Sequence, residues 1–260
     1  MSLQAQDIDL TIGGKRILRG VDFTARPGEV TAIVGPNGSG KTSLLRVMTG
    51  ETEAGGATHL NGLLVTRRNA PQLAAIRGVL PQASRLAFPF QALEVVRVGH
   101  QAGPHGADPD VPHQALRAVG LPGFEHRFYQ DLSGGEQQRV QLARVLAQIW
   151  KPVRGGQPCW LFLDEPVASL DIGHQLGIMN LARDFAQRGG GVVAVMHDLN
   201  LTAMFADKVA IMKEGAFIAA GTPSSVFDDA RLSDAYGCDL RINKRPDAGM
   251  PFILPQTAGG

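Results

Sequence analysis

A glycine-rich segment near the start of the chain fits the pattern G-x-x-x-x-G-K-[ST]. Its residues are Gly35, Pro36, Asn37, Gly38, Ser39, Gly40, Lys41 and Thr42, and Ser43 follows directly. Glycines permit the backbone angles that turn successive N–H groups toward phosphate oxygens. We expect Lys41 to reach the β- and γ-phosphates and the Thr42 hydroxyl to ligate Mg²⁺. The segment therefore predicts a binding loop for nucleotide phosphates.

Two acidic residues, Asp164 and Glu165, follow directly on an apolar run at 161–163. We expect Asp164 to hold Mg²⁺, directly or through water, and Glu165 to accept a proton from water that attacks the γ-phosphate. Taken alone, the pair also fits an acidic cap of a turn. His197 follows another apolar run, and we expect it to contact the γ-phosphate and sense its presence. Asp198 is predicted to cap the next helix.

These side chains must meet at one edge of a sheet. Nearly continuous apolar runs, typical of strands covered on both faces, stand at 30–34, 159–163 and 192–196. Helical patterns follow at 41–49, 173–188 and 199–206. This alternation predicts an α/β fold with a mainly parallel core sheet. Ligands bind at the carboxyl ends of such strands, which is where the glycine-rich loop, the acidic pair and His197 stand.

Weaker patterns surround this core. Apolar alternation predicts strands at 8–12 and 21–25, and residues 58–80 resemble short strands around an Asn61-Gly62 turn. Two weak helical patterns, at 92–98 and 111–119, predict a small helical insertion with a surface loop between them. Further along the chain, we expect a hairpin over 208–220 and a short helix near 229–236.

Three histidines lie in or beside that loop, at His100, His105 and His113. A metal or haem site there is one interpretation, but the spacing defines no ligand geometry. We therefore expect these side chains to lie in a solvent-exposed polar loop.

Composition restricts the class of protein. The chain has 260 residues, with 25 Lys+Arg against 24 Asp+Glu, which suits a single domain over 1–260. Its formal net charge of +1 argues against wholesale electrostatic binding of nucleic acid or anionic lipid. No apolar run approaches the roughly 18 residues of a membrane span, and the first residues do not resemble a secretory signal. Cys159 and Cys238 are expected to be buried or idle thiols of a reducing compartment, and a disulfide is the less favoured alternative.

The segment Leu132-Ser133-Gly134-Gly135-Glu136-Gln137-Gln138-Arg139 resembles the signature motif of ABC transporter ATPases. Ser133 and Glu136 also fit a capping box at a helix start. The exposed helix N-terminus at Gly134 and Gly135 suits a second anion. One nucleotide needs only one phosphate loop, so a second anion site is useful for a nucleotide held by another subunit.

Other motifs of that family follow in order. Gln82 resembles the Q-loop glutamine, Ser169-Leu170-Asp171 the D-loop, and His197 the switch histidine. The resemblance implies a P-loop NTPase fold with an N-terminal antiparallel β-subdomain and a helical subdomain at about 84–139. It also implies a homodimer that sandwiches two ATP molecules head to tail. Ser133, Gly134, Gly135 and Asp171 would bind the partner's ATP. By the same resemblance, Mg²⁺ would be bound by Thr42, Gln82 and Asp164. The catalytic residues would be Glu165, His197 and Gln82.

Two positions depart from the family pattern. An aromatic residue usually stacks on adenine near the end of the first strand, where this chain has Ile12. An aliphatic contact with little base discrimination is the corresponding expectation. Val167-Ala168 replaces a small polar pair after the acidic strand. Neither position takes part in the catalytic reaction, so we expect ATPase activity to be retained.

Within the family, residues 137–148, 151–158, 171–175 and 197–201 resemble the ATP-binding subunits of hemin importers. This implies ATP-driven hemin uptake through two transmembrane permease subunits, with a periplasmic hemin-binding protein acting indirectly. The chain would lie peripherally on the cytoplasmic side of the bacterial inner membrane, with no nucleic acid partner and with the insertion docked on the permease. Import of a ferric siderophore or cobalamin is the alternative, and a non-transport ABC ATPase acting on nucleic acid or ribosomes a remote one. The signature motif speaks against a third reading, a P-loop kinase or GTPase.

Overall fold

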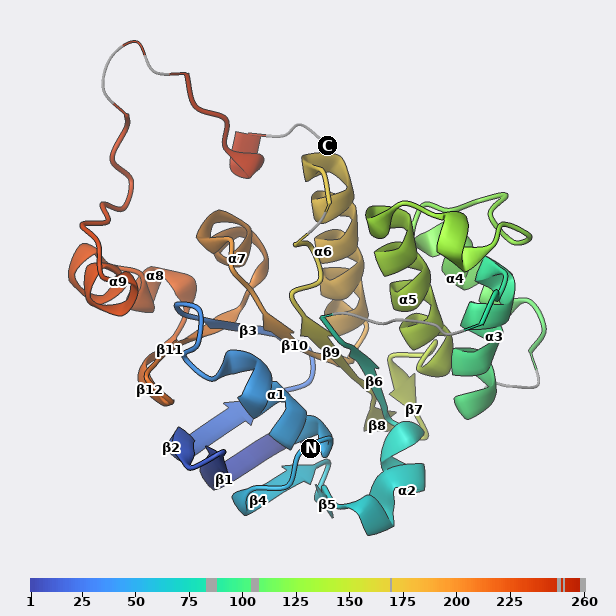
Figure 1. Cartoon of the computed structure of the whole chain (residues 1–260), viewed down its shortest axis with the longest axis horizontal. Coiled ribbons are helices and arrows are strands. Elements are labelled where there is room, and N and C mark those ends of the chain that lie inside the picture. Colours follow the sequence, from blue (N-terminus) through green and yellow to red (C-terminus); the bar gives the residue numbers. More distant parts are fainter. Residues whose placement is uncertain (83–87, 104–107, 169, 247–248, 250, 258–260) are drawn as a thin grey trace.

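The computed structural model describes residues 1–82, 88–103, 108–168, 170–246, 249 and 251–257. Within this part of the chain a central sheet lies between a helical layer and an antiparallel N-terminal sheet (Figure 1). The central sheet has the order β12-β11-β3-β10-β9-β6. Its strands are β3 (Val30–Val34), β6 (Arg77–Leu80), β9 (Trp160–Asp164), β10 (Gly191–Val195), β11 (Lys208–Lys213) and β12 (Ala216–Gly221). All neighbours are parallel except β11 and β12, as the apolar runs predict.

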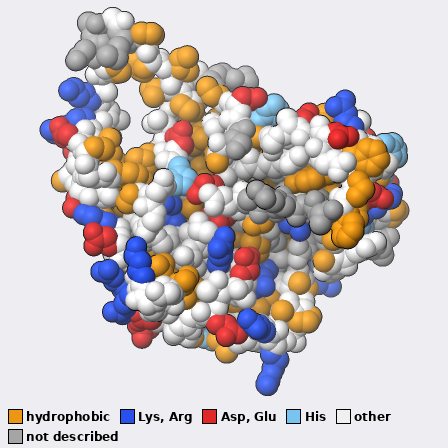
Figure 2. Space-filling view, in the orientation of Figure 1, with side chains coloured by type: hydrophobic (Ala, Val, Ile, Leu, Met, Phe, Trp, Pro, Cys, Tyr) orange, Lys and Arg blue, Asp and Glu red, His pale blue; other side chains and the backbone are white. Residues whose placement is uncertain are grey.

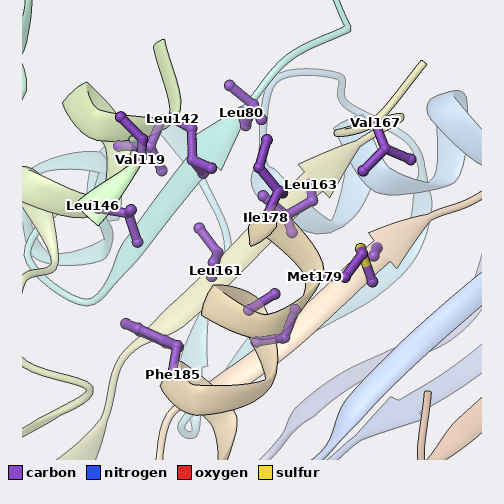
Figure 3. Close-up of a cluster of buried hydrophobic side chains, with 14 of the residues drawn as sticks. Leu80, Val119, Leu142, Leu146, Leu161, Leu163, Val167, Ile178, Met179 and Phe185 are labelled. Atoms are coloured by element: carbon purple, nitrogen blue, oxygen red, sulfur yellow. The ribbon is translucent and has the colours of Figure 1, made fainter. Parts of the chain in front are cut away.

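The central strands are buried on both faces because their alternate side chains enter two different cores. Trp160 and Phe162 of β9 pack in the core shared with the N-terminal sheet, while Leu161 and Leu163 face the helical layer. Figure 3 shows the second core, in which the leucines of β9 meet side chains such as Ile178. The helices of this layer are α5 (Gly134–Gln148), α6 (Ile172–Gln187) and α7 (Leu199–Phe205).

The N-terminal sheet covers the opposite face together with a helix that follows the phosphate loop. It has the order β2-β1-β4-β5. Its strands are β1 (Leu3–Ile12), β2 (Lys15–Ala25), β4 (Gly55–Leu60) and β5 (Leu63–Leu64), and the helix is α1 (Lys41–Thr49). The Asn61-Gly62 turn is confirmed, and both of its residues have positive φ. The Asn61 side chain also accepts a hydrogen bond from the buried Trp160 indole at 3.0 Å, which joins the two sheets.

The expectation of strands throughout 58–80 is wrong in its middle part. A 3₁₀ turn, η1 (Arg67–Asn69), and a short helix, α2 (Ala70–Ala74), separate β5 from β6. Pro71 stands near the start of α2, where its missing N–H is tolerated. Leu73 anchors the helix in the core beneath the N-terminal sheet. Burial of this leucine outweighs the weak strand pattern of the segment.

The predicted insertion contains α3 (Ala92–Ala102), α4 (Val111–Ala118) and a 3₁₀ turn, η2 (Tyr129–Asp131), and these elements pack on α5. Helix α3 approaches α5 so closely that a Cβ at Gly99 would collide with the Arg144 carbonyl. This contact explains a glycine that the sequence pattern leaves unassigned. Helix α5 continues beyond residue 139, so the expected end of the subdomain falls inside a helix.

The expectation of an exposed loop is wrong for His100, which lies on the last turn of α3 and is buried. The cause is the tight packing of α3 against α5. His113 lies in α4 and is partly buried. His105 lies outside the described residues.

Two smaller features complete the fold. The hairpin of β7 (Val153–Arg154) and β8 (Gln157–Pro158) forms the insertion before β9. The last described elements are α8 (Pro223–Val226), α9 (Asp229–Tyr236) and η3 (Pro255–Thr257), and η3 contacts α7.

Cys159 is buried, Cys238 is exposed, and both are free thiols. Within the described residues, no helix combines the length and apolar character of a membrane span.

A candidate ATP site at the carboxyl edge of the sheet

The glycine-rich loop joins the end of β3 to the start of α1. Gly35 has a φ of 147°, and a Cβ there would collide with the Met212 carbonyl of β11. Gly40 precedes the helix in a left-handed conformation. Neighbouring Ser39 accepts a hydrogen bond from Gly215 N at 2.9 Å. The loop is therefore packed against the β11–β12 hairpin, and its shape depends on glycine.

Lys41 occupies the interior of this loop. Its Nζ donates to the carbonyl oxygens of Gly35 at 2.8 Å and Pro36 at 3.0 Å. Lys41 as a whole residue is only 5% exposed. Burial lowers the pKa of Lys41, and the nearby carboxylates of Glu165 and Asp164 oppose that shift. An ammonium group bonded to loop carbonyls is placed to exchange these partners for phosphate oxygens.

A hydroxyl and a carboxylate meet where α1 begins and β9 ends. Thr42 Oγ1 donates to Asp164 Oδ1 at 3.0 Å, and Asp164 is 2% exposed. Burial raises the pKa of Asp164, while the bond from Thr42 acts in the opposite direction. A hydroxyl and a carboxylate are hard oxygen donors of the kind Mg²⁺ prefers. The donors present therefore fit this ion.

The buried Asp164 carboxyl gives a testable expectation for stability. Because burial raises its folded-state pKa above the unfolded value, ionisation opposes folding at neutral pH. Asp164→Asn keeps an acceptor for Thr42 and removes this penalty, so we expect the variant to have a higher Tm than the wild type at pH 7. The difference in Tm should shrink as the pH falls and vanish only well below about pH 4, the unfolded-state pKa of an Asp carboxyl, where Asp164 is protonated in both the folded and the unfolded wild-type chain. Thermal unfolding at several pH values without nucleotide checks this, and a lower Tm of the variant at pH 7 would contradict it.

Glu165 lies between the two other predicted catalytic residues. Its Oε1 is 2.6 Å from His197 Nε2, and its Oε2 accepts a bond from Gln82 Nε2 at 2.9 Å. The three residues follow the ends of three neighbouring strands. They lie close together because Val195 pairs with Asp164, and Leu80 with Leu163, in the register of the parallel sheet. The structure thus brings together Gln82, Glu165 and His197 at the edge where Asp164 and the phosphate loop lie.

The signature residues line a hollow, which we name the signature hollow. Ser133 accepts a hydrogen bond from Glu136 N at 3.3 Å and donates to the Glu136 carboxylate, which confirms the capping box. A hollow of about 420 Å³ is lined by Ser133, Gly134, Gly135, Glu136, Arg139, Leu170, Asp171 and His174. The structure therefore brings Asp171 to the signature helix. Ser169, the first D-loop residue, lies outside the described residues.

Two contacts were not foreseen from the sequence. His174 donates its backbone N–H to Asp171 Oδ1 at 2.9 Å, and its Nδ1 lies 2.7 Å from Asp171 Oδ2. These hydrogen bonds hold the pKa of the Asp171 carboxyl below its usual range. A signal was present, because Asp171 precedes a helix and His174 stands three residues on. The second contact joins Gln138 to Glu165, and no local pattern indicates it.

Three other predicted residues have less defined surroundings. Ser43 lies on the first turn of α1 and is partly buried. Asn37 is exposed on the loop. Ile12 ends β1 and is 54% exposed, which leaves its side chain available to a nucleotide base.

Asp198 caps α7 as predicted, because its Oδ1 accepts hydrogen bonds from Asn200 N and Leu201 N.

Fold and site together define a nucleotide-binding α/β ATPase. The family model described as ABC transporter matches residues 18–168. The curated protein "Hemin import ATP-binding protein HmuV" of Ruegeria sp. (strain TM1040) is 60% identical, with 99% of each chain covered. The protein of the same name from Jannaschia sp. (strain CCS1) is 58% identical over 98% of this chain and 95% of its own. The chain belongs to the ABC transporter family and is one of its ATP-binding subunits.

A solved structure confirms the fold over most of the chain. It is described as "Structure of ATP binding subunit of ABC transporter" and has a TM-score of 0.77 at 21% identity. The likeness covers 92% of this chain and 96% of that chain. The expectation of a P-loop ATPase with a mainly parallel core sheet, an antiparallel N-terminal sheet and inserted helices is therefore confirmed.

Proposed function

We propose that this chain hydrolyses ATP to power hemin import through a membrane permease. The proposal that hemin is the cargo rests on one observation. The chain is 60% identical, over 99% of both chains, to a protein named for hemin import. The site supports the reaction, because a carboxylate that hydrogen bonds to Gln82 and His197 stands at the sheet edge that carries the phosphate loop.

In the proposed reaction, Lys41 and the loop N–H groups bind the phosphates, and Glu165 accepts a proton from the attacking water. Thr42, Asp164 and Gln82 would hold Mg²⁺, which when bound neutralises phosphate charge. Gln82 and His197 orient the Glu165 carboxylate through their hydrogen bonds. The reaction needs a carboxylate that is ionised and held at a defined position.

The signature hollow supports the proposed homodimer. Ser133, Gly134 and Gly135 leave a helix N-terminus open beside Asp171, and buried Arg139 adds a positive charge. Such a helix end attracts anions. Two copies arranged head to tail would place this hollow over the ATP of the partner, so ATP would close the dimer and hydrolysis would reopen it.

The insertion at about 84–139 is the proposed contact with the two permease subunits. Large apolar side chains are exposed there, with Phe88 at 70%, Val98 at 54% and Phe128 at 45%. Figure 2 shows a group of apolar side chains over the region of α3 and α4, bordered by charged side chains. Attachment through a protein partner agrees with a peripheral position on the cytoplasmic side of the inner membrane.

Transport in proteoliposomes tests the cargo. The chain is reconstituted with its permease and periplasmic binding protein, and uptake of labelled hemin, ferric siderophore and cobalamin is compared. We expect ATP-dependent uptake of hemin and at most background uptake of the others. Uptake of a siderophore or cobalamin in place of hemin would contradict the cargo. Salt-sensitive binding to RNA or DNA would favour the non-transport alternative.

A further inference from the structure

The peptide unit of Glu165 is held in an uncommon backbone conformation. Its φ is 53°, in the left-handed region that residues other than glycine seldom adopt. Such a conformation persists only where the surroundings hold it. Glu165 N donates to Val195 O at 3.1 Å, which secures one side of the residue to β10.

The other side is held by the signature helix. Gln138 Nε2 donates to the Glu165 carbonyl oxygen at 3.2 Å, across 27 residues of sequence. The same carbonyl accepts a longer bond, of 3.4 Å, from Ala168 N within its own turn. Gln138 is therefore the contact that joins Glu165 to α5. A bond to the carbonyl fixes the backbone from which the catalytic side chain projects.

Gln138 also stands close to the phosphate-binding end of α5. It lies four residues after Gly134, about 6 Å along the helix axis at 1.5 Å per residue. Because a helix moves as a rigid body over so short a length, a displacement of Ser133 and Gly134 is passed to the Gln138 amide. In the proposed homodimer, this contact would connect the hollow that faces the partner's nucleotide with the residue that acts on this chain's own nucleotide.

We propose that Gln138 is a positioning residue for Glu165: its amide holds the Glu165 carbonyl and makes the place of the catalytic carboxylate depend on the place of the signature helix. This rests on the proposed role of Glu165 in ATP hydrolysis. Gln138 touches no reacting atom in this scheme and acts through the Glu165 backbone.

The test replaces the amide by a side chain of similar length that cannot donate. With the purified full-length chain, Gln138→Met is expected to lower kcat for ATP hydrolysis about tenfold, within the loss that follows a displaced catalytic group, and to leave KM for ATP within about twofold. Gln148→Met is the matched control, because Gln148 on the same helix donates to the carbonyls of Ala74 and Arg77, away from the site. It should lower Tm and leave kcat unchanged.

A double variant separates positioning from mere structural support. In the Glu165→Gln background, Gln138→Met should cause no further loss of the residual rate, measured with radiolabelled ATP, because residues that act as a unit are non-additive. An equal loss in both backgrounds, or a Gln138→Met variant with wild-type kcat, would overturn the proposal. An active wild type beside an inactive Glu165→Gln variant upholds the ATPase function, so these outcomes would remove the positioning role alone.

Discussion

Replacement of Glu165 by Gln is expected to lower the steady-state rate of ATP hydrolysis by about 10²–10⁴-fold, the usual contribution of a general base. The amide has the size of the carboxylate and leaves the Glu165 backbone bonds in place, but it cannot accept the proton of the attacking water. The phosphate loop and Lys41 are untouched, so ATP should still bind. Release of inorganic phosphate at saturating ATP measures the rate, and equilibrium binding measures the affinity.

The same variant should accumulate as an ATP-bound dimer, because ATP still closes the dimer whereas the hydrolysis that would reopen it is lost. Size-exclusion chromatography with and without ATP detects this species. Glu29→Gln is the matched control, since Glu29 immediately precedes β3 at the opposite end of the strands. It should hydrolyse ATP as the wild type does. Wild-type turnover by Glu165→Gln would remove Glu165 from the catalytic role.

Lys41→Met should weaken ATP binding by about 10²-fold or more. Hydrogen bonds to charged groups contribute about 1.5–3 kcal/mol each, and Lys41 has two loop carbonyls as its present partners. Met keeps the apolar stem in the buried position and removes the ammonium group. Isothermal titration with ATP measures the loss, and thermal unfolding without nucleotide confirms that the variant is folded.

Lys208→Met supplies the comparison for this second variant. Lys208 begins β11, at the end of the strand remote from the phosphate loop. Its replacement by Met removes the same charge as Lys41→Met does, without altering the loop. Its affinity for ATP should equal that of the wild type. If Lys41→Met bound ATP as tightly as Lys208→Met, the glycine-rich loop would not be the phosphate site.

Much of the candidate site could be predicted because its components are local. The loop of Gly35 and Gly40, the capping box of Ser133 and the acidic end of β9 each depend on a few adjacent residues. Apolar runs also indicated which segments form the central strands. Once these strands are parallel, their carboxyl ends meet at one edge, so the proximity of Gln82, Glu165 and His197 follows from strand order.

The sequence by itself determined the phosphate loop, the central strands and the order of the family motifs, because glycine geometry, helix capping and burial on both faces act over short stretches. Only the tertiary structure decided that α2 replaces a strand, that His100 is buried, and that Gln138 contacts the Glu165 carbonyl. Each of these depends on which elements pack together, and the free energy of such contacts comes from residues far apart in the chain. The hollow that joins Ser133 to Asp171 is of this second kind, since it exists only where α5 and the start of α6 lie side by side.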